Sequence, residues 1–290
     1  MPATAPSPLL LPAFEWRTAA GRAVRVRATP ASGRPVLLLT NAWPQTIRCW
    51  DAQWADLAAH HDLVAVDLPG FLVSPGEPAI MRPSAQADFL AALIDEWFDA
   101  PPVLVAPDVG VPIGLSLAAR YPAALAGLVV FDGPSQSPAD LTPAARSAAT
   151  SAMSRRVLNY FGAPFTLAAL AGGYRNRAGR PPWHIAREYV RAAASPTRFG
   201  LTLRFLESYP DELPRIAATL VQIQTPTLVT WGPKDPFVRA VSGRALADRL
   251  PNATWQPLDG ASHYAHEDAG ERFTTLLLDW LAAEVPGHAH

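Results

Sequence analysis

The chain has 290 residues, of which 49% are hydrophobic and 17% charged, a composition that excludes a disordered chain and allows a sizeable core. The formal net charge is −1 and no segment is dense in lysine or arginine, so we expect neither nucleic acid nor an anionic membrane as a partner. Cys49 is the one cysteine, which excludes an internal disulfide framework and a cysteine-rich metal site.

The N-terminal sequence predicts a cytoplasmic protein. Residues 1–12 carry no basic segment, and the apolar stretch Leu9–Leu11 is too short for the core of a signal peptide. No run approaches the ~18 apolar residues that a membrane-spanning helix needs. The oligomeric state stays open, and a homodimer is compatible with the sequence.

Short apolar runs alternate with helical patterns along most of the chain. Strands are predicted at residues 36–40, 63–66, 103–107, 128–131, 228–231 and 254–258. Helical periodicity is found at residues 50–60, 84–97, 111–121 and 242–250, and a closing helix is predicted at 271–283. Continuous apolar strands between helices indicate a mostly parallel sheet that is covered on both faces.

Residues 136–218 break this alternation. They contain several helical patterns but no convincing strand, and loop signals occur at Gly172-Gly173 and at Arg180-Pro181-Pro182. We therefore expect residues 1–135 and 219–290 to form one α/β core domain and residues 136–218 to form a helical cap. Such an insertion is expected over the carboxyl ends of the strands, where open α/β sheets bind ligands.

The most informative motif follows the strand at residues 103–107. The sequence V-L-V-A-P-D-V-G ends this strand in a sharp turn centred on Asp108, and a helix follows at once. A carboxylate that attacks an ester carbonyl gives a reactive mixed anhydride, whereas attack on an sp3 carbon gives a stable alkyl ester. Asp108 is therefore a candidate nucleophile for opening carbon–oxygen or carbon–halogen bonds.

A candidate base and its partner lie after the last two predicted strands. His263 lies in the small-residue loop G-A-S-H-Y, and a histidine can activate water because its ordinary pKa is near neutrality. Asp235 follows a strand by a short turn and could orient this histidine. Asp132, at the end of an earlier strand, is the alternative acid; the chain order of nucleophile, acid and histidine favours Asp235.

The turn at residues 41–44 is a candidate for binding negative charge or substrate. It begins at Asn41, and the backbone N–H of Trp43 could act beside that of Val109 as an oxyanion hole. The indole N–H of Trp43 is a single donor for a halide or a substrate oxygen, and an aromatic pocket wall is an equally good interpretation of this residue.

The insertion carries aromatic residues that could act above the nucleophile. A tyrosine hydroxyl placed there could protonate the alkoxide that an opening epoxide leaves. The aromatic residues in question are Tyr160, Tyr174, Trp183, Tyr189 and Tyr209. Each of them taken alone is more typical of a packing residue, but we expect one of the five to act in the site.

Five segments together resemble a known group. N-A-W-P, D-L-P-G-F, A-P-D-V-G, W-G-P-K-D-P-F and G-A-S-H-Y occur in the order of the α/β-hydrolases, over roughly residues 35–275. With aspartate at the elbow, the chain resembles the epoxide hydrolase and haloalkane dehalogenase branch. The resemblance implies the α/β-hydrolase fold with a helical cap insertion. It also implies that Asp108 is the nucleophile, His263 the base and Asp235 its partner.

The chain departs from the patterns of this group at two turns. The family's H-G-x-P turn reads Asn41-Ala42-Trp43-Pro44, so its histidine and glycine are both replaced. Alanine adopts a positive φ at a higher cost than glycine, which bears on the geometry of this turn. In the D-L-P-G-x-G pattern, Leu72 replaces the second glycine.

Three functions follow as alternatives, none of which needs a metal or a cofactor. The favoured one is an epoxide hydrolase for a small apolar substrate, with Tyr160, which precedes Phe161, as the proton donor. The second is a haloalkane dehalogenase, in which Trp43 and Trp183 would hold the halide; the tryptophan that many dehalogenases carry after the nucleophile is Val109 here. The third is a non-hydrolytic scaffold that binds a ligand or acts as an isomerase or cyclase.

Overall fold

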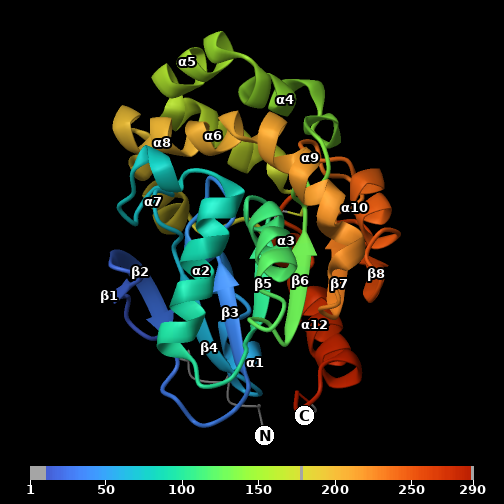
Figure 1. The fold of residues 1–290 in the computed structure, drawn as a ribbon. Coiled ribbons are helices and arrows are strands. Elements are labelled where there is room, and N and C mark those ends of the chain that lie inside the picture. The colour runs from blue at the N-terminus through green and yellow to red at the C-terminus, as the bar shows by residue number, and fades with distance from the viewer. Residues whose placement is uncertain (1–10, 177–178, 289–290) are drawn as a thin grey trace, which may run out of the picture.

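A computed structural model describes residues 11–176 and 179–288. Its centre is an eight-stranded sheet with the strand order β1-β2-β4-β3-β5-β6-β7-β8 (Figure 1). The strands are β1 (Glu15–Ala19), β2 (Arg22–Ala28), β3 (Val36–Thr40), β4 (Asp62–Val66), β5 (Val103–Pro107), β6 (Gly127–Phe131), β7 (Thr227–Trp231) and β8 (Ala253–Pro257). The strands from β4 to β8 are parallel, as the alternation of strands and helices predicts.

The first two strands were not predicted from the sequence. β1 and β2 form an antiparallel hairpin, and β2 pairs antiparallel with β4 at this edge of the sheet. In β2, Arg25 and Arg27 alternate with valines, a pattern that predicts exposed arginine side chains. Both side chains are buried because acidic residues far along the chain pair with them: Asp67 with Arg25 and Asp51 with Arg27.

Helices cover both faces of the sheet. On one face lie α2 (Pro83–Trp97), α3 (Gly110–Arg120) and α10 (Ala240–Ala247), and on the other lie α1 (Trp54–Ala58) and α12 (Gly270–Glu284) (Figure 1). In β5, Leu104 and Ala106 belong to the first core, and Val103 and Val105 to the second. This two-sided burial explains why the parallel strands are apolar throughout instead of alternating.

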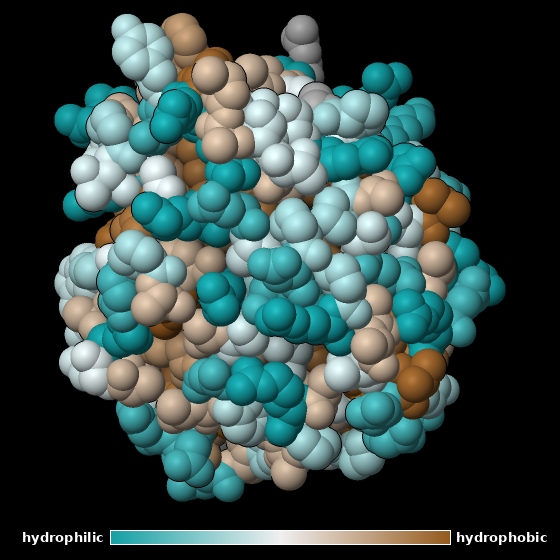
Figure 2. All heavy atoms as spheres, turned by 45° about the horizontal axis from the view of Figure 1, so that its top comes forward, coloured by the Kyte–Doolittle hydropathy of each residue, from teal (hydrophilic) through white to brown (hydrophobic). Residues whose placement is uncertain are grey.

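Six helices between β6 and β7 lie over the carboxyl ends of the strands (Figure 1). We call them the cap helices: α4 (Pro143–Thr150), α5 (Ala152–Tyr160), α6 (Gly162–Gly173), α7 (Trp183–Ala193), α8 (Pro196–Glu207) and α9 (Tyr209–Thr219). The remaining short elements are α11 (Ala265–Asp268) and the 3-10 turns η1 (Ile47–Trp50), η2 (Pro78–Ile80), η3 (Pro138–Asp140) and η5 (Leu220–Gln222). On the surface in Figure 2, hydrophobic residues are interspersed with hydrophilic ones. No helix within the described ranges is both long and apolar enough to cross a membrane.

Candidate active site

Asp108 occupies the sharp turn between β5 and α3. Its φ is +48°, a left-handed conformation that costs a non-glycine residue roughly 1–2 kcal/mol. The turn is held from both sides: the N–H of Asp108 donates to the carbonyl of Phe131 at 2.9 Å, and its own carbonyl accepts from Val111 at 3.0 Å. Gly133 permits this close packing, because a Cβ there would lie 2.0 Å from the carbonyl oxygen of Asp108. These contacts hold the strained turn, which places Asp108 at the end of the strand.

Two backbone N–H groups hold the Asp108 carboxylate. Oδ2 accepts from the N–H of Trp43 at 2.8 Å, and the neighbouring N–H of Val109 also favours the ionised carboxylate. These are the two groups that the sequence suggested for an oxyanion hole. Burial raises the pKa of Asp108 to about 6, although His263 and the two N–H groups oppose this shift. The carboxylate is therefore mostly ionised at neutral pH.

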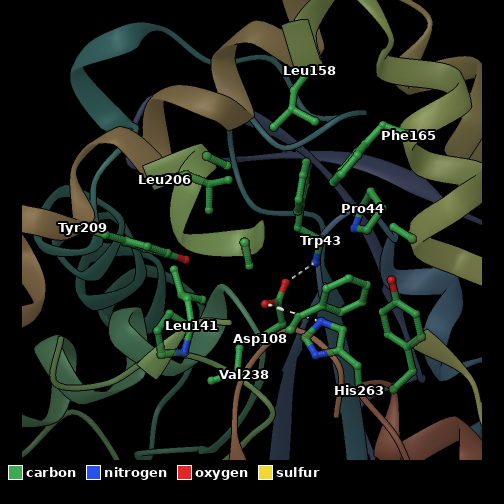
Figure 3. Close-up of a pocket in the computed structure, with 16 residues that line it drawn as sticks. Trp43, Pro44, Asp108, Leu141, Leu158, Phe165, Leu206, Tyr209, Val238 and His263 are labelled. Atoms are coloured by element: carbon green, nitrogen blue, oxygen red, sulfur yellow. Dashed lines mark hydrogen bonds and ion pairs between the residues drawn. The ribbon is translucent and has the colours of Figure 1, made fainter. Parts of the chain in front are cut away.

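His263 lies between two aspartates. Its Nε2 is 3.8 Å from Oδ1 of Asp108 (Figure 3). Its Nδ1 is 2.9 Å from Oδ2 of Asp235. The other oxygen of Asp235 accepts from the N–H of Phe237 at 2.7 Å and of Val238 at 3.0 Å. These bonds fix the carboxylate, and the carboxylate in turn orients the imidazole so that Nε2 faces Asp108.

The charges around His263 set its protonation state. Burial alone would lower the pKa of this imidazole, but Asp235, Asp108 and Asp132 together raise it to about 9. At neutral pH the resting site therefore holds an imidazolium beside the Asp108 carboxylate. Loss of the negative charge on Asp108 would remove one of the interactions that keep His263 protonated.

Asp132, the alternative acid, does not reach the imidazole by a hydrogen bond. Its Oδ1 accepts from the N–H of Gly232 at 2.9 Å, and its Oδ2 accepts from the N–H of Ala265 at 3.0 Å. These two N–H groups belong to the segments that carry Asp235 and His263. Asp132 thus joins the two segments through its carboxylate. It lies directly after β6 and has a φ of +57°. Burial raises its pKa well above the usual range.

A cavity of about 250 Å³ opens above Asp108 (Figure 3). The core contributes Asp108, His263, Trp43 and Phe237 to its wall, and the cap helices contribute apolar side chains that include Leu158, Phe165, Ala169 and Leu206. The ring of Phe237 meets that of His263 edge-on at 4.8 Å. Such a wall suits a small apolar compound and holds few groups that could bind a charged one.

Tyr209, the first residue of α9, brings a hydroxyl group into this cavity from the cap. The side chain is 1% exposed, and its hydroxyl points toward Asp108 (Figure 3). Burial and the nearby charge of Asp108 raise the pKa of Tyr209 well above 10, so the phenol is protonated and can donate.

The placement expected for two other cap residues is corrected. Tyr160 is 82% exposed at the end of α5, and Trp183 is 64% exposed at the start of α7; neither lines the cavity. Both helices turn other faces toward the core. Of the five aromatic cap residues that the sequence offered, Tyr209 is the one in the cavity wall, and Tyr264 beside His263 is a wall residue that the sequence reasoning missed.

The turn at residues 41–44 also differs from the expectation. Asn41 does not face the cavity: its Oδ1 accepts from the N–H of Leu68 at 2.9 Å, which joins the loops after β3 and β4. The ring of Trp43 lines the cavity and packs on Phe165 and Phe199, but its indole nitrogen is occluded and has no hydrogen-bond partner among the described residues. Trp43 is thus an aromatic wall that also supplies a backbone N–H. No cluster that could hold a metal ion is found in the described part of the chain.

The chain belongs to the alpha/beta hydrolase fold family, whose model matches residues 35–270. A 2-hydroxy-6-oxononadienedioate/2-hydroxy-6-oxononatrienedioate hydrolase of Burkholderia vietnamiensis is 24% identical over 241 residues, which is 77% of each chain. A hydrolase of the same description from Pseudomonas putida is 34% identical over 76 residues, so the match spans only 27% of that relative and 26% of this chain. Among solved structures, the haloalkane dehalogenase DbeA of Bradyrhizobium elkani superimposes with a TM-score of 0.79 at 25% identity, covering 93% of this chain and 98% of that one.

Proposed function

We propose that this α/β-hydrolase is an epoxide hydrolase that works through an alkyl-enzyme ester on Asp108. The observation that carries the proposal is the elbow residue itself: a carboxylate, held by two backbone N–H groups, with an imidazole on one side and a phenol on the other. The apolar cavity above it suits a small organic epoxide.

In the first step, Oδ1 of Asp108 attacks one carbon of the epoxide ring. The new bond joins carbon to Asp108, the carbon–oxygen bond of the ring breaks, and the ring oxygen takes the proton of the Tyr209 hydroxyl. The imidazolium of His263 then returns a proton to Tyr209, directly or through the new hydroxyl group. This leaves a neutral ester, a neutral tyrosine and a neutral imidazole.

In the second step, His263 removes a proton from water, and the oxygen attacks Cγ of the ester. The N–H groups of Trp43 and Val109 stabilise the resulting oxyanion; losing one such donor typically costs about 3 kcal/mol. The bond from Cγ to the alkyl oxygen then breaks, and the proton left on the added oxygen passes to the departing diol. Asp108 returns to its ionised form and His263 to its protonated form.

The pKa of His263 supports this order of events. With Asp108 ionised, the imidazole has a pKa of about 9 and is a poor base at neutral pH. Esterification removes the charge of Asp108, so the pKa of His263 falls at the stage when a base is needed. The same carboxylate thus serves first as nucleophile and then, by its loss of charge, as a switch for the base.

A haloalkane dehalogenase is the second candidate, and the likeness to DbeA favours it. Both reactions share the ester, but a halide leaving group needs N–H donors and not a proton. The indole N–H of Trp43 is occluded, Val109 replaces the tryptophan expected beside it, and Trp183 lies outside the cavity. A phenol that faces the nucleophile suits an alkoxide better than a halide.

The two candidates are separated by product analysis of the wild-type enzyme. A panel of small aliphatic and aromatic epoxides and the matching chloro- and bromoalkanes is incubated with enzyme, and diol and free halide are measured. We expect diols without halide release. Halide release with no diol would replace the proposal by dehalogenation, and the formation of neither diol nor halide would contradict both.

A further inference from the structure

A second polar group of residues lies beside His263. It consists of Gln45, Tyr174, Tyr189, Tyr264 and Glu267, which we call the tyrosine cluster. The rings of Tyr264 and His263 are 5.0 Å apart, and those of Tyr264 and Tyr174 are 4.5 Å apart. Tyr174, Tyr189 and Tyr264 pack together in one buried group.

Hydrogen bonds join three members of the tyrosine cluster. The hydroxyl of Tyr174 donates to Oε2 of Glu267 at 2.6 Å, and Nε2 of Gln45 donates to the hydroxyl of Tyr174 at 2.6 Å and to the same carboxyl oxygen. Burial raises the pKa of Glu267 to about 8, against the effect of these bonds, so this carboxyl group is largely neutral at pH 7.

Three polar atoms of the tyrosine cluster are buried without a partner among the described residues. They are Oε1 of Gln45 and the hydroxyl oxygens of Tyr189 and Tyr264, all on side chains that are at most 1% exposed. An unsatisfied buried polar atom costs about 1–3 kcal/mol, so several of them in one place are rare. Internal water with two to four polar partners is the usual remedy.

The tyrosine cluster also has an inner and an outer end. At the inner end, Tyr264 lines the active-site cavity next to His263. At the outer end, Glu267 lines a surface pocket together with Arg48, Asp51 and Arg180. The active-site cavity itself is mostly apolar, so it offers water few polar partners on its way to the ester.

We propose that the tyrosine cluster binds internal water molecules and delivers them from the surface pocket at Glu267 to His263 for hydrolysis of the ester. This role rests on the proposed function, since only an ester intermediate needs such water. Substrate enters the apolar cavity, whereas water reaches the base by a separate polar route. The cluster residues position water and do not react with the substrate.

The first test is a crystal structure of the wild-type enzyme at a resolution that shows buried waters. We expect ordered water within hydrogen-bond distance of Oε1 of Gln45 and of the hydroxyl groups of Tyr189 and Tyr264. Absence of water at these atoms, with buried water visible elsewhere, would overturn the proposal. This outcome does not depend on what the enzyme hydrolyses.

The second test separates the two half-reactions by rapid quenching with one epoxide that the enzyme turns over. In Tyr189→Phe we expect ester formation at the wild-type rate and ester loss about five- to tenfold slower, as for the loss of one hydrogen bond to the water. Tyr160→Phe makes the same change at the surface and should alter neither rate. An unchanged rate of ester loss in Tyr189→Phe would refute the delivery of water by the tyrosine cluster. If the wild-type enzyme forms no ester, the proposed function is refuted, and the crystal structure alone then tests whether the cluster binds water.

Discussion

At the scale of single residues, the site depends on carboxylates with different tasks. Asp108 faces the cavity and would carry the ester in the proposed mechanism, Asp235 hydrogen-bonds to His263, and Asp132 accepts two backbone N–H groups from the segments of Asp235 and His263. The three lie around one imidazole, yet each has its own set of donors. The hydrogen-bond partners of each aspartate, and not its distance from His263, distinguish the role assigned to it.

This division predicts different defects for the two supporting aspartates. Asp235→Asn should slow ester hydrolysis by roughly 10³–10⁴-fold, because the imidazole loses the partner that sets its orientation and charge, as in a serine-protease triad. Asp132→Asn should lower the free energy of unfolding by about 1–3 kcal/mol, because an amide keeps one of the two accepted bonds, and should reduce the hydrolysis rate far less. Rapid-quench kinetics and denaturant unfolding measure both; equal kinetic defects would contradict the assignment.

Tyr209 is predicted to act in the first half-reaction only. Tyr209→Phe should slow epoxide opening by about 10²–10⁴-fold, the range typical of a lost general acid, because no proton then reaches the alkoxide. Hydrolysis of an ester already formed should be unaffected. Tyr160→Phe is the matched control. Opening of the epoxide at the wild-type rate in Tyr209→Phe would remove this residue from the mechanism.

The core of the site could be predicted from the sequence, and the cap could not. The motif around Asp108 is local, because strand, turn and helix follow one another within a few residues, and the same holds for the loop of His263. The choice between Tyr160 and Tyr209 is not local. It depends on which face each cap helix turns to the cavity, and distant packing partners decide this.

At the scale of elements, the loop after β4 shows how the chain replaces a family glycine. Leu72 has a φ of +48°. Its side chain is buried in a cluster with Ala192 of α7 and with Phe199 and Leu203 of α8. Ala42, by contrast, is not at a positive φ, so the turn at residues 41–44 does not need its missing glycine. Leucine at position 72 therefore keeps a strained backbone, and its buried contacts with the cap offset the cost of that strain.

The usual stability order of alanine and glycine should be reversed at this position. Leu72→Ala loses the buried side chain and keeps the strain, which should cost about 2–5 kcal/mol. Leu72→Gly loses the same contacts but relieves the left-handed backbone, so it should be more stable than Leu72→Ala by about 1 kcal/mol. Chemical unfolding of the three proteins measures this. A less stable glycine variant would show that the backbone at residue 72 is not strained.

The hairpin of β1 and β2 escaped prediction for a related reason. Arg25 and Arg27 alternate with apolar residues, a pattern typical of a half-exposed strand. The carboxylates that make their burial tolerable come from residues 42 and 24 positions away, Asp67 and Asp51. Pairing over such distances along the chain cannot be read from a local pattern.

At the scale of the whole molecule, buried and partly buried polar contacts join the cap to the core. Glu188 of α7 accepts from Arg25 at 2.8 Å and from Thr46 at 3.0 Å, and Tyr174 meets Gln45 and Glu267. The cap is therefore held over the cavity by more than apolar packing. Glu267, in this set of contacts, and His263 have raised pKa values, so stability should depend on pH.

Stability should fall as the pH rises from 7 to 9. The pKa of Glu267 is raised from 4.5 to about 8 and that of His263 from 6.5 to about 9, so in this window the folded protein holds protons that the unfolded chain has lost. The lowered pKa of His266 acts below pH 6.5 and does not contribute here. Glu267→Gln should reduce the fall by on the order of 1 kcal/mol. Calorimetric Tm values at pH 7, 8 and 9 measure this, and a rising or constant Tm would contradict it.

The central claim is a covalent alkyl ester on Asp108, and intact mass spectrometry of His263→Ala tests it most directly. This variant lacks the base but keeps the nucleophile, so the ester should persist after incubation with an epoxide. We predict an added mass equal to the whole epoxide, located on Asp108 by peptide mapping and absent from an Asp108→Asn, His263→Ala double variant. An adduct equal to a haloalkane less its hydrogen halide would instead establish dehalogenation. A folded protein that gains no mass from a broad panel of both compound classes would contradict the account and favour a non-hydrolytic role for this scaffold.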